Sequence, residues 1–113
     1  MLIAEDDEAV RELIRINIEL AGHEVVGEAT NGREALDLLQ AERPDVLILD
    51  MMMPNMNGRE VLEELCKAEY DGTTVLAFSA APTELDRAIE LGADAAVLKT
   101  GDFDMLVDAL ATL

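Results

Sequence analysis

The spacing of apolar and polar positions changes several times along the chain, and this alternation predicts short strands separated by helices. Five short runs carry apolar residues without helical spacing, and we expect them to be strands at residues 1–4, 25–29, 45–49, 74–78 and 95–98. Apolar residues elsewhere recur at three- and four-residue steps, which predicts helices at about residues 8–21, 33–41, 58–68, 82–91 and 102–110. Residues that stop helices follow three of these segments: Gly22, Pro44 and Gly92.

A strand followed by a helix, repeated five times, predicts an α/β fold in which helices cover both faces of a parallel sheet. The third strand is apolar at its last four positions without alternation, which is typical of a strand buried on both faces. We therefore predict a flavodoxin-like, doubly wound sheet in the order 2-1-3-4-5. A chain of 113 residues has the length of one domain, so we expect residues 1–113 to form a single domain.

The composition argues against several classes of function. The chain has 25 Asp and Glu residues against 8 Lys and Arg, a formal net charge of −17. A domain this acidic repels phosphate backbones and anionic lipids, so we expect no direct binding of nucleic acid or membranes. We find no apolar run long enough to span a membrane and no signal peptide. The single cysteine cannot form an internal disulfide, which fits a reducing compartment, and we expect a cytoplasmic protein.

Polar residues follow four of the five predicted strands. Glu5 and Asp6 follow the first strand, Asp50 the third, Ser79 the fourth and Lys99 the fifth. Ligands of open α/β sheets bind beyond the carboxyl ends of the strands, where the strand order reverses. In the order 2-1-3-4-5 this point lies between the first and third strands, so we expect these five side chains to line one site.

The residue types in this site favour phosphoryl chemistry. Clustered carboxylates raise one another's pKa unless a cation lies among them, and Mg²⁺ prefers such oxygen ligands. We expect Glu5 and Asp6 to hold the metal and Asp50 to act as the nucleophile that forms an acyl phosphate. Ser79 and Lys99 would then contact phosphoryl oxygens.

Each of these residues also has an ordinary structural interpretation. Asp6 or Asp7 could cap the helix that begins near residue 8. Asp50 could be a solvated loop residue, Ser79 a turn residue, and Lys99 a lysine whose side chain lies in solvent. It is their joint placement on successive strands that favours a site.

Other chemically distinctive residues have simpler interpretations. We interpret Cys66 as a small core residue and His23 as a surface residue. The four methionines of the loop before the third helix, Met51, Met52, Met53 and Met56, are expected to pack the loop, because no Cys or His accompanies them.

Four motifs are similar to those of one known family. They are IAEDD at residues 3–7, VLILDMMMPNMNG at 46–58, AFSA at 77–80, and GADA at 92–95 running on to Lys99. On these motifs the chain resembles the receiver domain of two-component response regulators, including chemotaxis regulators, over essentially its whole length. The resemblance implies that a histidine kinase or a phosphotransfer protein donates a phosphoryl group to Asp50 with Mg²⁺. The domain then changes its surface and binds an output partner.

The resemblance also implies a role for each residue of the site. Counting back from Arg11 selects Glu5 and Asp6 as the family's acidic pair. Asp6 would ligate Mg²⁺ directly and Glu5 through water, together with Asp50 and the main-chain carbonyl of Met52. Ser79 would be the switch hydroxyl, and Lys99 the cation paired with the phosphoryl group.

The chain departs from the family pattern near the last strand. The family usually has an aromatic residue three positions before the lysine, where this chain has Ala96, and a proline after the lysine, where it has Thr100. The residues that border the attacking water in the family correspond to Met52 and Ala81, which have no polar side-chain group. Because neither can orient a water, we predict a long-lived phosphoaspartate.

Three functions compete for this sequence. The leading one is a phosphoacceptor receiver that catalyses its own phosphorylation and dephosphorylation without turning over an external substrate. The second is a pseudo-receiver that binds proteins independently of phosphorylation, which Ala96 and Thr100 support. The third, a phosphatase that uses an aspartyl phosphate, lacks the second acid near the nucleophile and a substrate cap.

The resemblance places partner surfaces on the fourth and fifth helices and the last strand. This face is acidic in the present chain, with the residues Glu84, Asp86, Arg87, Glu90, Asp102 and Asp108. Three outcomes stay open for it: a homodimer, binding of a basic partner, or a monomer. Any DNA binding would belong to another module.

Overall fold

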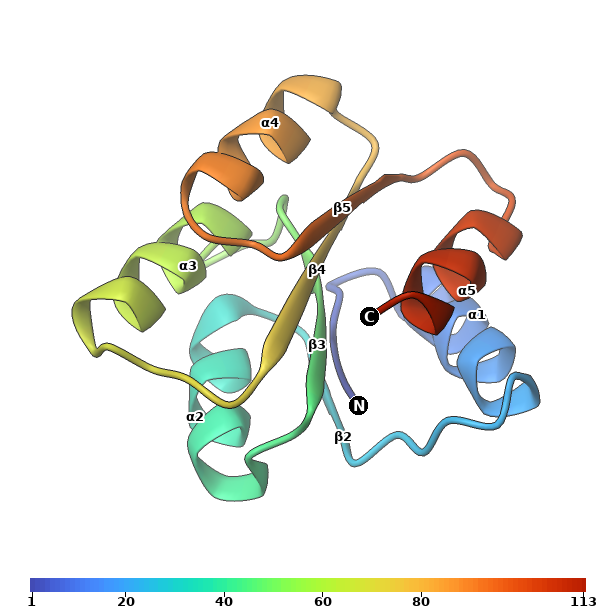
Figure 1. Ribbon diagram of the computed structural model, residues 1–113, viewed down its shortest axis with the longest axis horizontal. Helices are drawn as coiled ribbons and strands as arrows, with labels where there is room; N and C mark the ends of the chain where they lie inside the picture. The colour runs from blue at the N-terminus through green and yellow to red at the C-terminus, as the bar shows by residue number, and fades with distance from the viewer.

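A computed structural model describes all residues from 1 to 113. Strands and helices alternate along the whole chain (Figure 1). The strands are β1 (Leu2–Ala4), β2 (Gly27–Ala29), β3 (Val46–Asp50), β4 (Thr74–Ser79) and β5 (Ala95–Leu98). The helices are α1 (Glu8–Leu20), α2 (Gly32–Glu42), α3 (Gly58–Lys67), α4 (Pro82–Glu90) and α5 (Asp104–Ala111).

The strands form one parallel sheet in the order β2-β1-β3-β4-β5, which confirms the predicted topology. β3 lies at the centre and is buried along its whole length. Leu2 of β1 pairs with Leu47, and Leu76 of β4 pairs with Ile48, so β3 is hydrogen-bonded on both sides. The carboxyl ends of β1, β3 and β4 therefore finish at the same edge of the sheet.

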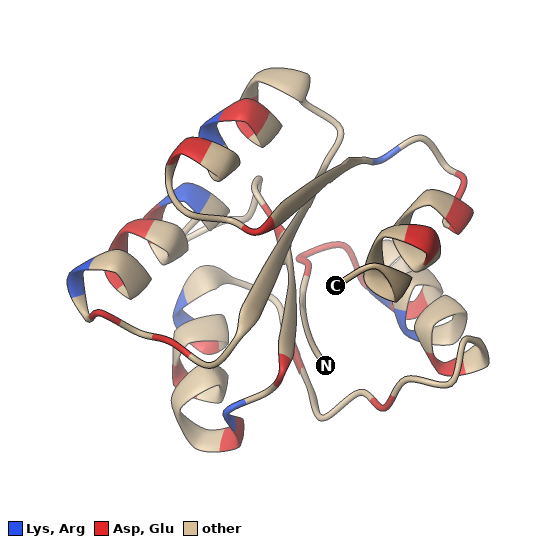
Figure 2. Ribbon diagram, viewed as in Figure 1, with Lys and Arg blue, Asp and Glu red and all other residues tan.

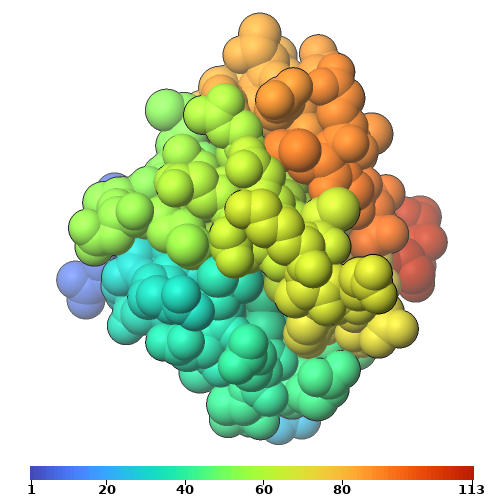
Figure 3. Space-filling view, turned by 90° about the vertical axis from the view of Figure 1, so that its left-hand side faces the viewer, coloured from blue at the N-terminus to red at the C-terminus, as the bar shows by residue number.

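Two hydrophobic layers cover the sheet. α1 and α5 lie on one face, and α2, α3 and α4 lie on the other (Figure 1). Figure 3 views the second face, where α2 (cyan), α3 (yellow-green) and α4 (orange) cover the sheet side by side. Successive residues of β3 alternate between the layers, since Leu47 and Leu49 belong to one cluster and Ile48 belongs to the other. None of the helices is both long enough and apolar enough to cross a membrane.

Local capping interactions explain where three helices begin. The side chain of Asp7 accepts a hydrogen bond from the N–H of Val10 and caps α1. Asn31 caps α2 in the same way, and Asn57 and Glu60 form a reciprocal capping box at the start of α3. Of the two acids that could cap α1, the structure selects Asp7.

Several predicted element boundaries differ from the structure by one or two residues, and Cys66 was placed wrongly. β2 begins at Gly27 rather than at residue 25, although the N–H of Val26 does bond to the carbonyl of Met1. Cys66 is exposed rather than part of the core. At 100° per residue, Cys66 lies roughly a quarter turn from the centre of the buried stripe of α3, which Val61 and Leu62 define.

Candidate functional site

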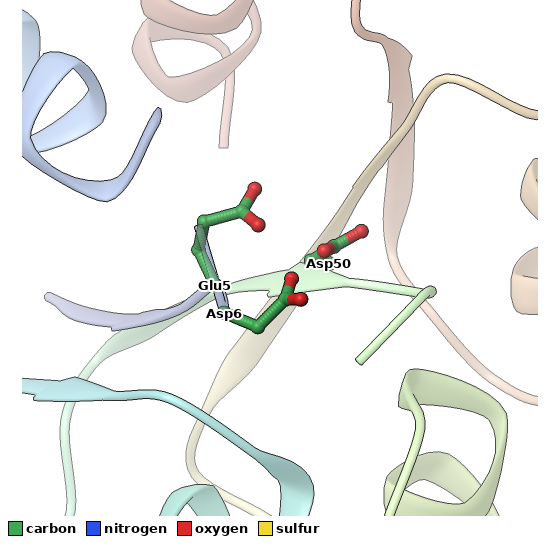
Figure 4. A group of neighbouring side chains, drawn as sticks. All are labelled: Glu5, Asp6 and Asp50. Atoms are coloured by element: carbon green, nitrogen blue, oxygen red, sulfur yellow. The ribbon is translucent and has the colours of Figure 1, made fainter. Parts of the chain in front are cut away.

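Three carboxylates converge at the carboxyl edge of the sheet (Figure 4). Asp50 ends the central strand β3, and Glu5 and Asp6 directly follow β1. One ligand oxygen from each of the three lies within 4.8 Å of the others. Glu5 and Asp50 are buried, whereas Asp6 is exposed. The sequence-predicted acidic cluster is therefore assembled, with one open side toward solvent.

Lys99 extends from the end of β5 into this cluster. Its Nζ forms an ion pair with Oε1 of Glu5 and lies 3.4 Å from Oδ1 of Asp50. The main chain of Lys99 is also fixed, because its N–H donates to the carbonyl of Ser79 at 2.8 Å. The ammonium is 5.6 Å from the centre of the Phe78 ring, which adds a cation–π contact. Lys99 thus bridges the two buried carboxylates.

Main-chain groups hold both buried acids in place. The N–H of Met52 donates to Oδ1 of Asp50 at 3.1 Å, and the N–H of Asp7 donates to Oε2 of Glu5 at 3.3 Å. The Glu5 backbone is itself anchored, because its carbonyl accepts from Nη1 of Arg11 at 3.0 Å. These contacts limit the rotation of the carboxylates before any ligand arrives.

Burial shifts the ionisation of this cluster toward the protonated form. Loss of hydration raises the pKa of Glu5 to about 7, although the hydrogen bond to Lys99 opposes the shift. Burial also raises the pKa of Asp50, and its interactions with Glu5, Met52 and Lys99 oppose that shift. The single ammonium of Lys99 therefore does not offset the effect of burial on the pKa values of the two carboxyl groups.

The donor set fits a hard divalent cation. Closely spaced carboxylate oxygens whose ionisation is disfavoured, and an open side at the exposed Asp6, match the preference of Mg²⁺ for a few carboxylates and several waters. An added divalent charge would also favour the ionised forms of Glu5 and Asp50. The acidic cluster therefore has ligands and a solvent-facing side that suit Mg²⁺.

The side chains of two predicted site residues, Ser79 and Met52, form no hydrogen bond with the acidic cluster. Ser79 is buried at the end of β4, one residue beyond Phe78, the register partner of Asp50, and its Oγ accepts from the N–H of Ala81 at 3.3 Å. Met52 contributes its N–H to Asp50, while its side chain is 61% exposed. Ser79 borders the site and forms no hydrogen bond with the carboxylates.

Sequence reasoning missed three contacts of the site. These are the ion pair between Lys99 and Glu5, the support of the Glu5 carbonyl by Arg11, and the N–H of Asp7 on the Glu5 side chain. The contact between Arg11 and the Glu5 carbonyl could have been predicted from sequence, because the two residues are six positions apart, across a loop and the first turn of α1.

The fold and the site together define a flavodoxin-like α/β protein with an acidic, lysine-containing centre at the carboxyl edge of its sheet. The sequence profile of the response regulator receiver domain matches residues 1–111, and the chain belongs to this family. It is a receiver domain of the two-component type, as its motifs predict.

Individual relatives agree with this assignment. The chemotaxis protein CheY of Thermotoga maritima is 32% identical over 111 residues, which cover 97% of this chain and 92% of CheY. The response regulator MprA of Mycolicibacterium vanbaalenii is 39% identical over 95 residues, 84% of this chain. This chain spans only 40% of MprA and 39% of the similar regulator PhoP of Bacillus subtilis.

Solved structures give the same result. The response regulator TrrA of Thermotoga maritima, in complex with Mg²⁺ and BeF, has a TM-score of 0.87 and 30% identity, covering 98% of this chain and 95% of TrrA. A LuxR-family DNA-binding response regulator from Staphylococcus aureus has a TM-score of 0.89 and 32% identity, covering 98% and 94%.

Proposed function

We propose that this receiver domain accepts a phosphoryl group on Asp50 and that residues 1–113 form a single receiver domain. The observation that carries the proposal is the convergence of Asp50, Glu5 and Asp6 within 4.8 Å, with Lys99 bridging the two buried acids. A carboxylate oxygen of Asp50 attacks phosphorus and forms an acyl phosphate, while the leaving group departs with the electrons of the bond that breaks.

Mg²⁺ would be held by the carboxylates of Glu5, Asp6 and Asp50 and by the main-chain carbonyl of Met52. The cation supplies charge neutralisation and Lewis acidity at the phosphoryl oxygens. The structure of the relative TrrA was solved with Mg²⁺ and BeF, which supports a similar requirement here. Asp6 is the exposed member of the set, so it lies where an ion from solvent arrives first.

Lys99 and Ser79 have complementary roles in this proposal. Lys99 gives up part of its contact with Glu5 and Asp50 to pair with a phosphoryl oxygen, and the hydroxyl of Ser79 donates a hydrogen bond to another. Ser79 is on β4, next to the strand that ends in Asp50, and the N–H of Ala81 already orients its oxygen.

A receiver domain implies a histidine kinase as its partner. We propose a histidine kinase or a phosphotransfer protein as the donor, acting in the cytoplasm, and an effector domain or separate output protein as the recipient of the signal. The face made by α4, β5 and α5 is our candidate output surface, and a homodimer through it is one form the output could take.

A pseudo-receiver that works without phosphorylation is the second candidate. Ala96 pairs with Ala77 of β4 and is half-buried, so β5 offers no aromatic side chain that could change position on activation. The intact Asp50, Glu5 and Lys99 favour the phosphoacceptor over this alternative.

Intact-mass measurement after incubation with Mg²⁺ and acetyl phosphate tests the proposal. The unmodified protein should gain one phosphoryl mass, an Asp50→Ala variant should gain none, and Asp71→Ala, which removes an exposed carboxylate elsewhere, should gain the same as the unmodified protein. No gain, with Mg²⁺ binding also absent by titration, would favour the pseudo-receiver. No gain with Mg²⁺ bound would leave a histidine kinase as the required donor.

A further inference from the structure

The loop between β3 and α3, residues 51–57, carries a main-chain N–H that bonds to Asp50. The N–H of Met52 bonds to the Asp50 carboxylate, and the side chains of Met51 and Met53 are buried in the core. Farther along, the N–H of Met56 bonds to the carbonyl of Pro54 at 2.7 Å, and Asn55 has a φ of 65°. Hydrogen bonds and buried side chains therefore fix the conformation of the loop, so a shift of one residue would move the residues next to it.

The loop is closed on itself where it enters α3. The N–H of Gly58 donates to the carbonyl of Met51 at 3.2 Å. A Cβ at position 58 would lie 2.7 Å from the carbonyl oxygen of Asp50 and from Cα of Met51. These are backbone atoms that cannot move aside as a side chain can, so Gly58 ties the end of the loop to its beginning.

A second close contact joins the loop to α2, which is not adjacent in sequence. Gly32 is the first residue of α2, and its N–H is one of the helix N–H groups without a partner inside the helix. It donates to the carbonyl of Met56 at 2.8 Å. A Cβ on Gly32 would lie 2.4 Å from that same carbonyl oxygen and 2.8 Å from Cβ of Met56.

Packing and capping hold α2 in place more strongly than they hold the tip of the loop. Ala35, Leu36 and Leu39 of α2 are buried in the core, and Asn31 caps the helix. In contrast, Pro54 and Asn55 at the tip of the loop are exposed. A side chain at position 32 would therefore push the loop outward rather than displace the helix.

We propose that Gly32 is a positioning residue for phosphoryl transfer, which fixes the loop that presents the Met52 main chain to Asp50. This inference rests on the proposed function, because it assumes that Asp50 and Met52 lie in the phosphorylation site. The lack of a side chain at position 32 lets the Met56 carbonyl approach α2. Because the loop is closed by the hydrogen bond between Gly58 and Met51, the position of Met56 also determines the position of Met52.

The test compares Gly32→Ala with Gly92→Ala. A Cβ at position 92 meets nothing within 4 Å, but the φ of 105° strains it, so this control loses stability without touching the loop. Mg²⁺ affinity is measured by calorimetry, and the rate of phosphorylation by acetyl phosphate is measured at saturating Mg²⁺, at a temperature where circular dichroism shows both variants folded. We expect Gly32→Ala to weaken Mg²⁺ binding by about tenfold and to slow phosphorylation, and Gly92→Ala to change neither.

Amide spectra of the unmodified protein supply a second measurement that needs no variant. During a Mg²⁺ titration the amide resonance of Gly32 should shift together with that of Met52, while that of Gly92 stays in place. A Gly32→Ala variant that binds Mg²⁺ and is phosphorylated like the unmodified protein, or a Gly32 resonance that does not respond, would overturn this inference and leave the proposed function intact. Failure of the unmodified protein itself to bind Mg²⁺ and accept phosphoryl would overturn both.

Discussion

Glu5 and Asp50 are acids that folding removes from water, and Lys99 is the cation that contacts both. Burial is the largest influence on either pKa and raises both values. The site therefore stores unfavourable electrostatic energy that a divalent cation can relieve. We therefore expect the stability of the protein to depend on pH and on Mg²⁺.

The first prediction concerns unfolding free energy against pH in Mg²⁺-free buffer. The pKa of Glu5 rises from 4.5 to about 7 on folding, so the folded state binds its proton more tightly than the unfolded state. This group favours folding fully below pH 4.5, and that contribution is lost as the pH rises through about 7. We expect a loss of about 1–2 kcal/mol from this site, measured by urea unfolding between pH 5 and about pH 8.

A Glu5→Gln variant isolates this effect from the other carboxylates. Its unfolding free energy should fall less over the same pH range, and saturating Mg²⁺ should stabilise the unmodified protein more at the upper end of the range than at the lower end. Parallel pH profiles for the two proteins would show that Glu5 does not titrate as proposed.

A second prediction concerns the lifetime of the phosphorylated protein. Met52 is 61% exposed beside Asp50, and neither Met52 nor Ala81 has a polar side-chain group to orient an attacking water. We expect slow hydrolysis without a phosphatase, and loss of phosphate at least about tenfold faster in Met52→Asn, followed by intact mass over time. A half-life of seconds for the unmodified protein would contradict this prediction.

At the scale of elements, the segment between β1 and α1 contributes both to the acidic cluster and to the cap of α1. Three acids follow β1, and the structure gives them different surroundings: Glu5 is buried, Asp6 is exposed near the other carboxylates, and Asp7 caps the helix. A carboxylate at the N-terminus of a helix bonds free N–H groups and interacts favourably with the helix dipole.

The third prediction follows from this division. Asp7→Ala should lower the unfolding free energy by about 1 kcal/mol, because the N–H of Val10 loses its acceptor. Asp7→Asn keeps a capping oxygen and should lose less. Both variants should bind Mg²⁺ with unchanged affinity, whereas a large loss of affinity in Asp7→Asn would mean that Asp7 is itself a metal ligand.

Element order, strand order and the acidic edge were predictable because each depends on local sequence pattern and on general rules of α/β topology. The pairing of Glu5 with Lys99 was not, since it depends on side-chain directions of residues 94 positions apart. Cys66 was misplaced because an apolar neighbourhood in sequence does not fix which side of a helix faces the core. The contact of Gly32 with Met56 could not be predicted either, because main-chain atoms join the start of α2 to the loop between β3 and α3.

At the scale of the whole molecule, negative charge is spread over the surface. Asp and Glu occur on all five helices, and Lys and Arg are absent from α5 (Figure 2). On the face formed by α4, β5 and α5, Arg87 is already engaged with Glu90 at 3.3 Å. Two copies that met through this face would bring together mostly acidic side chains, including Asp86 and Asp108.

The fourth prediction is that self-association of the unphosphorylated protein depends on salt. Repulsion between like faces should keep the protein monomeric at low ionic strength, and any dimer should strengthen as NaCl screens the charges. Sedimentation velocity at several salt concentrations measures this directly. A dimer that is tightest at low salt would instead indicate attraction between complementary charges.

The central claim is that Asp50 is the phosphoacceptor, and locating the phosphoryl group tests it most directly. The protein is phosphorylated with Mg²⁺ and acetyl phosphate and reduced with borohydride, which converts an aspartyl phosphate to homoserine. Peptide mass spectrometry then identifies the altered position. The account predicts homoserine at position 50 and no change at Glu5 or Asp6. Modification at another residue, in a protein that gains phosphoryl, would contradict it.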